Sequence, residues 1–267
     1  MNAARDTNEE VDKFVKEYAD STRDDPVLSS VLYAPLPTNK VNRMLHQVPI
    51  MPQQPNNNNN NNNGRNKECK SFHVDFSKDV RGWQVEHINM PYNVIGGRGP
   101  TLNATDYIRF GKISATVRSA GAGGSVTAFI LLADGGDEID FEFLGGDVRT
   151  VQTNYFWGPS KEFTVNGGFH TVAGGDVDKE FHKYTIDWKP DSIEWLVDDK
   201  LIRTKMRKDT CDSAGLCKFP SEPARIQFGL WDGSIEPGTA EWSRGPIDWS
   251  EPHNVTAYLR DVKVECY

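Results

Sequence analysis

The sequence lacks a long hydrophobic run. Apolar residues make up 37% of its 267 residues, and they nowhere form the stretch of about 18 that a membrane-spanning helix needs. The opening residues, Met-Asn-Ala-Ala-Arg-Asp-Thr, are not followed by the apolar segment of a secretory signal peptide. We therefore expect neither a membrane-spanning segment nor a signal peptide.

Basic residues are also fewer than acidic ones. Asp and Glu number 38 against 30 Lys and Arg, which gives a formal net charge of −8. This balance argues against nucleic acid or an anionic membrane surface as the main partner. The chain has no C-x-x-C pair, so nothing in it indicates a zinc site.

Cysteine is scarce, with four residues in all. We expect one disulfide between Cys69 and Cys266 and a second between Cys211 and Cys217. The alternative is four buried thiols in a reducing compartment. Disulfides imply export, which the missing signal peptide does not support.

Three explanations stay open: an incomplete chain start, an unconventional export route, or an intracellular protein. The triplets Asn103-Ala-Thr and Asn254-Val-Thr are acceptors for N-glycosylation only if the chain is exported.

Residues 1–67 do not resemble a folded domain. Apolar residues on one face predict a short amphipathic helix from about Glu9 to Ala19. Prolines and polar residues follow, and then eight consecutive asparagines at Asn56–Asn63. Such low-complexity sequence has nothing to bury, so we expect a mostly disordered N-terminal extension that ends before residue 68.

Residues 68–267 consist of short alternating segments separated by turn residues, with hardly a helical period among them. This texture predicts one all-β domain, an antiparallel jelly-roll sandwich of the concanavalin-like type. We expect a central strand at Ser125–Leu132, where the apolar run is nearly continuous. Further expectations are single strands at Tyr107–Val117 and Phe163–Val165 and a turn at Gly96–Pro100.

The segment Asp-Glu-Ile-Asp-Phe-Glu-Phe-Leu-Gly, residues 137–145, alternates acidic and apolar side chains. In a β-strand, Glu138, Asp140 and Glu142 therefore share one face and the apolar residues share the other. The two glutamates are four positions apart, so their Cα atoms lie about 13 Å apart. If the side chains lean together, roughly 5–6 Å remains between the carboxyl groups, close to the about 5–5.5 Å of retaining glycosidases. The alternative is a half-buried strand with a solvated acidic face.

These same residues resemble the active-site signature of glycoside hydrolase family 16. The stretch Arg225-Ile-Gln-Phe-Gly-Leu-Trp-Asp-Gly, followed by Pro237-Gly-Thr-Ala-Glu-Trp and Gly245-Pro-Ile-Asp-Trp, resembles the fungal Crh-type chitin–glucan transglycosylases within that family. The resemblance implies a retaining enzyme of cell-wall β-glycans that cleaves chitin and transfers it to β-glucan. Alternatives are an endo-β-glucanase or xyloglucan endotransglycosylase-type enzyme, and a non-catalytic glycan-binding module on the same fold.

The family pattern also implies roles for individual residues. Glu138 corresponds to the nucleophile and Glu142 to the acid/base, while Asp140 hydrogen-bonds the nucleophile; this chemistry needs no metal and no cofactor. Sugar contacts fall, beside Glu142, on Gln227, Trp231, Thr239 and Trp242, and two strand residues, Gln152 and Asn154, project toward the same groove. For the tryptophans the alternative is hydrophobic packing. In this chain Ser243-Arg-Gly replaces the Ala-Gly-Gly of the branch, which places Arg244 near the acceptor side.

The resemblance further implies a polysaccharide substrate, chitin or β-glucan, and an extracellular or cell-wall location. We expect the protein to act as a monomer.

Overall fold

A computed structural model describes residues 28–29, 69–76, 78, 81–86, 98–159, 161–250 and 255–267. The helix expected at Glu9–Ala19, the asparagine tract and Asn254 of the second triplet lie outside the described residues. The division of the chain at residue 67 and the disorder of the extension therefore stay predictions.

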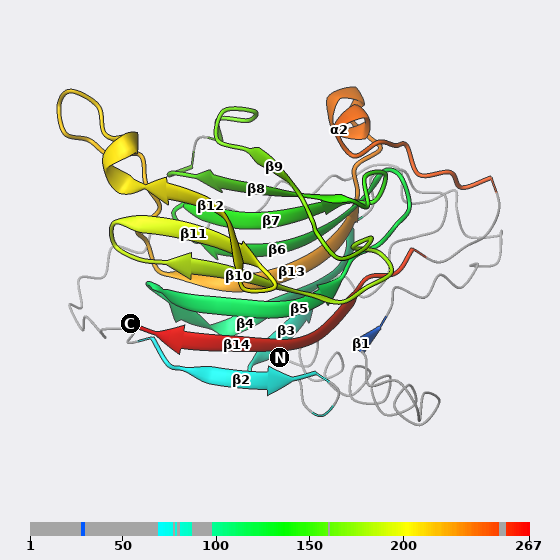
Figure 1. Cartoon of the computed structure of the whole chain (residues 1–267), viewed down its shortest axis with the longest axis horizontal. Helices are drawn as coiled ribbons and strands as arrows, with labels where there is room; N and C mark the ends of the chain where they lie inside the picture. The colour runs from blue at the N-terminus through cyan, green and yellow to red at the C-terminus, as the bar shows by residue number, and fades with distance from the viewer. Residues whose placement is uncertain are drawn as a thin grey trace, which may run out of the picture.

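The described residues form two antiparallel seven-stranded sheets (Figure 1). One sheet has the strand order β3-β4-β13-β6-β7-β8-β9; because β7 contains the acidic–apolar segment, we call it the carboxylate sheet. Its strands are β3 (Trp83–Glu86), β4 (Arg98–Ile108), β13 (Ala224–Asp232), β6 (Ser125–Ala133), β7 (Glu138–Leu144), β8 (Thr150–Phe156) and β9 (Gly168–Thr171).

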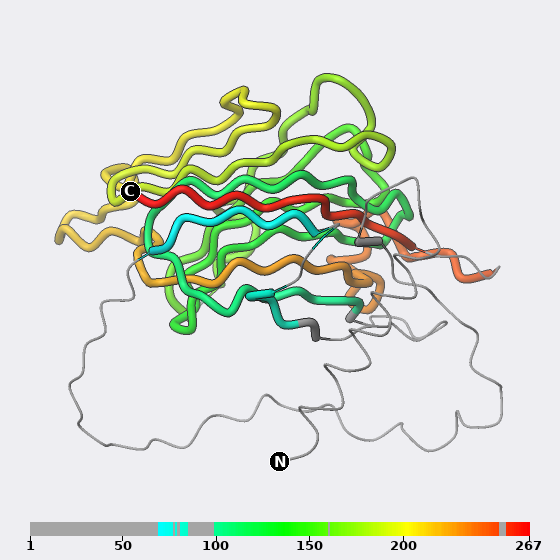
Figure 2. The backbone as a smooth tube through the Cα atoms, turned by 90° about the horizontal axis from the view of Figure 1, so that it is seen from below, coloured from blue at the N-terminus to red at the C-terminus, as the bar shows by residue number. Residues whose placement is uncertain are grey.

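The second sheet has the order β1-β14-β5-β10-β11-β12, and β2 also pairs with β14. Figure 2 shows β14 in red running beside β2 in cyan. The strands of this second sheet are β1 (Leu28–Ser29), β14 (Tyr258–Cys266), β5 (Gly111–Arg118), β10 (His182–Trp188), β11 (Ser192–Val197), β12 (Lys200–Met206) and β2 (Phe72–Asp75). The predicted all-β jelly-roll sandwich is confirmed.

Large aromatic side chains fill the space between the sheets. Phe129 and Phe141 come from the carboxylate sheet, Tyr184 and Trp195 come from the second sheet, and all four are fully buried. The Trp195 indole also donates a hydrogen bond of 3.1 Å to the backbone carbonyl of Asp140. This contact fastens the middle of β7 to the sheet beneath it.

Three local expectations from the sequence are wrong. Tyr107–Val117 is not one strand, because the chain turns at Phe110, whose φ is +61°, between β4 and β5. Arg98–Pro100 is the start of β4 rather than a turn. Residues 163–165 form a turn in which Phe163 and Val165 are 71% and 65% exposed, so their alternation does not reflect a buried face.

Two short helical segments accompany the sheets in the described part of the chain, η2 (Arg207–Thr210) and α2 (Pro237–Trp242). No helical period predicts α2, which is only six residues long and begins at a proline. Figure 1 shows it beyond the ends of β7 and β8. Among the helices of the described residues, none has the length and apolar character to span a membrane.

Both expected disulfides are present. Cys69 and Cys266 are bonded across 197 residues of chain and close the domain at the end of β14, whereas Cys211 and Cys217 close a loop of six. Asn103, by contrast, is a poor acceptor for a glycan: it lies in β4, is 5% exposed and accepts a hydrogen bond from Gln227.

Candidate active site

Strand β7 places its acidic side chains on the face turned away from the second sheet. Ile139, Phe141 and Phe143 belong to the buried core, so alternation sends Glu138, Asp140 and Glu142 to the opposite face. Glu138 and Glu142 are half-buried and Asp140 is 1% exposed. The structure thus brings together the three carboxylates that the sequence singles out.

The neighbouring strands surround these carboxylates with few charges. On β6, Leu132 lies opposite Glu138 and Ala128 lies opposite Glu142. On β8, Phe156 lies opposite Glu138 and Gln152 lies opposite Glu142. Apolar neighbours of this kind lower the local dielectric, which strengthens every interaction between the charges that remain.

Two of the three carboxyl groups hold their protons unusually tightly. Burial, followed by repulsion from Glu138, raises the pKa of Glu142 to about 8. Burial, followed by repulsion from Glu142 and Glu138, raises the pKa of Asp140 well above its usual range. Neither oxygen of the Asp140 side chain has a hydrogen-bond partner within the described residues. At neutral pH, therefore, Glu142 carries a proton that it can give up.

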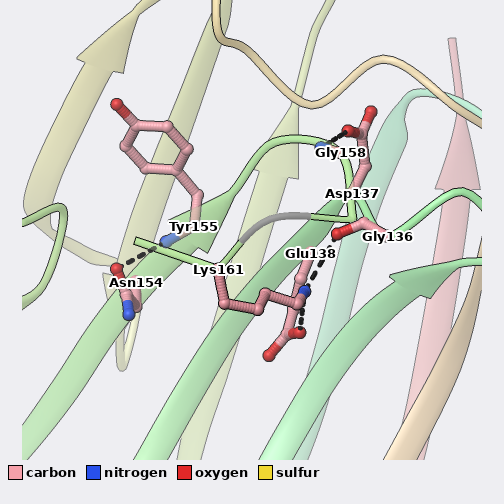
Figure 3. A network of polar contacts seen from close by, with 7 residues as sticks. All are labelled: Gly136, Asp137, Glu138, Asn154, Tyr155, Gly158 and Lys161. Carbon is pink, nitrogen blue, oxygen red and sulfur yellow. Dashed lines mark hydrogen bonds and ion pairs between the residues drawn. The ribbon is translucent and has the colours of Figure 1, made fainter. Parts of the chain in front are cut away.

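A lysine that the sequence did not point to contacts the third carboxylate. Lys161 donates from Nζ to Glu138 Oε2 at 2.7 Å and to the carbonyl of Gly136 at 2.9 Å (Figure 3). Its ammonium also lies 4.7 Å from the centre of the Phe156 ring. Lys161 belongs to the loop between β8 and β9, 23 residues beyond Glu138, so no strand periodicity could reveal the contact.

The loop that carries Lys161 is fixed beside β7 by Asp137. This buried aspartate accepts hydrogen bonds from the backbone N–H groups of Gly158, Ser221 and Glu222 at 2.8, 2.7 and 3.1 Å. The preceding turn allows close approach, because Gly136 has a φ of +98° and a Cβ there would meet the Gly158 carbonyl oxygen at 2.6 Å. Figure 3 shows Asp137 bound to Gly158 on the same loop as Lys161.

The other end of β7 faces two tryptophans. Trp231 on β13 and Trp242 in α2 stack with ring centroids 6.1 Å apart. The Trp242 indole donates a hydrogen bond of 2.5 Å to the side-chain oxygen of Gln152, which lies opposite Glu142. The structure therefore brings Gln152, Trp231 and Trp242 to the Glu142 end of the acidic face.

The remaining expected sugar contacts are more enclosed. Gln227 donates to Asn103 at 2.6 Å, while the Asn154 oxygen accepts from the N–H of Tyr155 and the residue is only 5% exposed. Thr239 is half-buried in α2, where its carbonyl accepts from Ser243. These placements leave sugar contact by the three residues a prediction.

A pocket of about 490 Å³ opens at the Glu138 end of β7. Its lining includes Trp157, Glu162 and Lys218, and the last two form an ion pair of 2.8 Å.

Two glutamates and an aspartate on one sheet face suit the two-carboxylate chemistry of a glycoside hydrolase. Residues 54–251 match the family model of the glycosyl hydrolases family 16. The chain belongs to this family, as its signature segment predicts.

Similar proteins include fungal members of the family. Crh-like protein 2 of Aspergillus fumigatus is 40% identical over 67% of this chain, and the probable glycosidase CRR1 of Saccharomyces cerevisiae is 37% identical over 63%. Each alignment covers 42% of the relative, so the chain spans less than half the length of these curated relatives. The predicted Crh-type resemblance is confirmed.

Solved structures agree with this assignment. A Crh5 transglycosylase in complex with NAG superposes with a TM-score of 0.67 and 32% identity, over 74% of this chain and 84% of the other. A Bacillus licheniformis beta-glucanase, at 23% identity and a TM-score of 0.59, shares the fold.

Proposed function

We propose that this domain is a retaining glycosidase and transglycosylase of cell-wall β-glycans, which cleaves chitin and transfers the cleaved chain to β-glucan. The proposal rests above all on one observation: Glu142, with a pKa raised to about 8, lies on the same strand face as the ion-paired Glu138. An enzyme that keeps one carboxyl protonated beside an ionised one has both groups that glycoside cleavage requires.

In the first step, the Glu138 carboxylate attacks the anomeric carbon of the donor sugar. Glu142 transfers its proton to the oxygen of the breaking glycosidic bond, so that the leaving chain departs as a neutral alcohol. A covalent glycosyl ester on Glu138 results, and Glu142 is left as a carboxylate.

In the second step, Glu142 takes a proton from an acceptor hydroxyl, whose oxygen attacks the same anomeric carbon and releases Glu138. A sugar hydroxyl gives transfer and water gives hydrolysis. Two displacements at one carbon retain its configuration, and each step leaves both glutamates ready for the next.

Asp140 supports Glu138 in this scheme. Its raised pKa favours the protonated form, and a protonated carboxyl group can donate a hydrogen bond to a neighbouring carboxylate. Neither Asp140 oxygen has a hydrogen-bond partner within the described residues, so this bond would form in the substrate complex, where it would orient Glu138 and spread its charge. For sugar binding we propose Trp231 and Trp242 as ring-stacking residues, with polar contacts from Glu142 and the following side chains: Gln152, Asn154, Gln227 and Thr239.

The test is a product assay with defined sugars. The protein is incubated with chitin oligomers as donors and labelled β-1,3-glucan oligomers as acceptors, and hybrid and shortened products are separated by mass. Hybrid products support transfer and shortened chitin supports hydrolysis. Absence of both would contradict the proposal, and replacing the donor with mixed-linkage glucan or xyloglucan tests the alternative substrates.

A glycan-binding module without activity is the other candidate, because the fold alone also suits carbohydrate binding. The variant Glu138→Gln separates the two: it loses every product if the site is catalytic, and it matches the parent if the site only binds. An extracellular or cell-wall location follows from the same proposal, since the substrate is found there.

A further inference from the structure

Glu138 is the only one of the three β7 carboxylates with an ion-pair partner among the described residues. Lys161 reaches Glu138 Oε2 at 2.7 Å, and the two side chains are 26% and 17% exposed. An ion pair shielded to this degree is screened less by water and salt than one at the open surface. The pair therefore matters for the charge of the site.

We propose that Lys161 is the positioning residue that keeps Glu138 ionised and orients it for attack. The inference rests on the proposed function, in which Glu138 is the nucleophile. Three carboxylates this close cannot all ionise cheaply. A cation held against one of them decides which member carries the negative charge.

The geometry of the loop supports a built contact rather than a chance one. Lys161 spans from Gly136 O to Glu138 Oε2, so it bridges the turn before β7 and the first residue of the strand. Asp137 binds the Gly158 N–H and holds the loop three residues away from Lys161. The ammonium lies over the Phe156 ring, which excludes water from one side of the pair.

No other charged side chain among the described residues is placed to stabilise the negative charge of Glu138. Arg203 of β12 donates to Thr153 and Asn166, and its charge, like that of Lys161, lowers the pKa of Asp140. Arg225 of β13 lies 3.9 Å from Asp134.

The remaining neighbours do not replace Lys161 either. Glu162, next along the loop, pairs with Lys218. The residues opposite Glu138 on β6 and β8 are Leu132 and Phe156, which do not titrate. From its own strand, Asp140 and Glu142 face Glu138, whose charge raises the pKa of both.

The experiment compares Lys161→Met and Lys161→Gln, which remove the charge, with Lys161→Arg, which keeps it. Lys218→Met is the matched control, because it removes the ion pair with Glu162 on the same loop and leaves Glu138 untouched. The pH dependence of kcat/KM for chitin cleavage is measured for each. We expect the acidic limb to move up by about one pH unit in the two neutral variants. It stays near the parent's position in Lys161→Arg and Lys218→Met.

A neutral variant whose acidic limb coincides with that of the parent would overturn the inference. So would an equal shift in Lys218→Met, which would indicate a general loss of loop structure. A second readout does not depend on activity: the carboxyl ¹³C signal that is missing in Glu138→Gln is titrated in the parent and in Lys161→Met. If the parent makes no product, the proposed function fails, yet this titration still decides whether Lys161 controls the charge of Glu138.

Discussion

Trp242 donates its indole hydrogen to the side chain of Gln152 across 2.5 Å, which joins helix α2 to strand β8 beside Glu142. The bond holds one aromatic wall of the site against the sheet. Trp231 of β13 stacks on the same ring, so the hydrogen bond also helps to keep the two tryptophans together.

The variant Trp242→Phe keeps an aromatic ring and removes this hydrogen bond. Because such a bond contributes about 1 kcal/mol, we expect KM for chitin oligomers to rise about fivefold with a smaller effect on kcat. Trp242→Ala removes the stacked ring as well and should raise KM further. Unchanged kinetics in both variants would mean that Trp242 only packs against the sheet.

Activity should fall as the pH rises through about 8. Below that pH Glu142 is protonated and can serve as the acid, and above it the proton is lost. Glu142→Gln should lower kcat on unactivated chitin oligomers by about 10²–10⁴. Rate profiles of the parent from pH 5 to pH 10 test the first statement; a basic limb well away from 8 would contradict it.

The stability of the fold should also depend on the protonation of Glu142 and Asp140. A carboxyl group whose pKa is raised by folding stabilises the fold fully below its unfolded value and loses this contribution as the pH rises through the folded value. For Glu142 that window runs from 4.5 to about 8. The parent should therefore melt at a lower temperature at pH 9 than at pH 5, and Glu142→Gln and Asp140→Asn should flatten this fall. Glu162→Gln, on an exposed side chain, is the control and should leave the curve unchanged.

The two disulfides should differ in their effect on stability. The Cys69–Cys266 bond closes 197 residues and the Cys211–Cys217 bond closes six. The chain-entropy relation gives about 5 kcal/mol for the first loop and about 2 kcal/mol for the second. Denaturant unfolding of Cys69→Ser/Cys266→Ser and Cys211→Ser/Cys217→Ser should reproduce this order; a larger loss from the short loop would argue against loop closure as the main cause.

Asn103 should carry no glycan even when the protein is secreted from a glycosylating host. Its side chain is buried in β4 and bound to Gln227, so a sugar attached there would break a hydrogen bond of 2.6 Å and lift the strand. Mass spectrometry of the peptide that contains Asn103 provides the measurement. Full occupancy of this residue would mean that the strand forms only after modification.

The sequence was most informative where two signals coincided. In β7 the alternation of acidic and apolar residues matched both a strand with a buried face and a known signature, and the structure has that face in the core. The run at Ser125–Leu132 likewise became β6, which lies between β13 and β7 with most of its residues buried. A strand that is buried on both faces has a nearly continuous apolar sequence, which is easily recognised.

Strand predictions that rested on alternation alone were wrong. The alternation from Tyr107 to Val117 continues through a reversal of the chain. The chain reverses at Phe110, which adopts a left-handed backbone conformation that is uncommon for phenylalanine. Phe163 alternates with Val165 although both are exposed; the Phe163 ring makes an edge contact with Phe156 at the end of β8, with ring centroids 5.7 Å apart. Local pattern carries no record of such contacts.

The loop contacts of the site were beyond the sequence altogether. Lys161 meets Glu138 only because Asp137 binds the loop backbone and the turn at Gly136 permits close approach. Each of these residues is ordinary in its own segment. They come together only because the chain after β8 folds back beside β7.

Both reacting groups of the proposed mechanism sit on β7, whose middle is fastened to the opposite sheet by Trp195. The spacing of their Cα atoms is thus a property of one extended backbone. The wall formed by α2 lies outside that strand, so exchanging it between homologues should leave the spacing intact. Grafting α2 from an enzyme of different preference should redirect which polysaccharide is processed while the stereochemical course of the reaction stays the same.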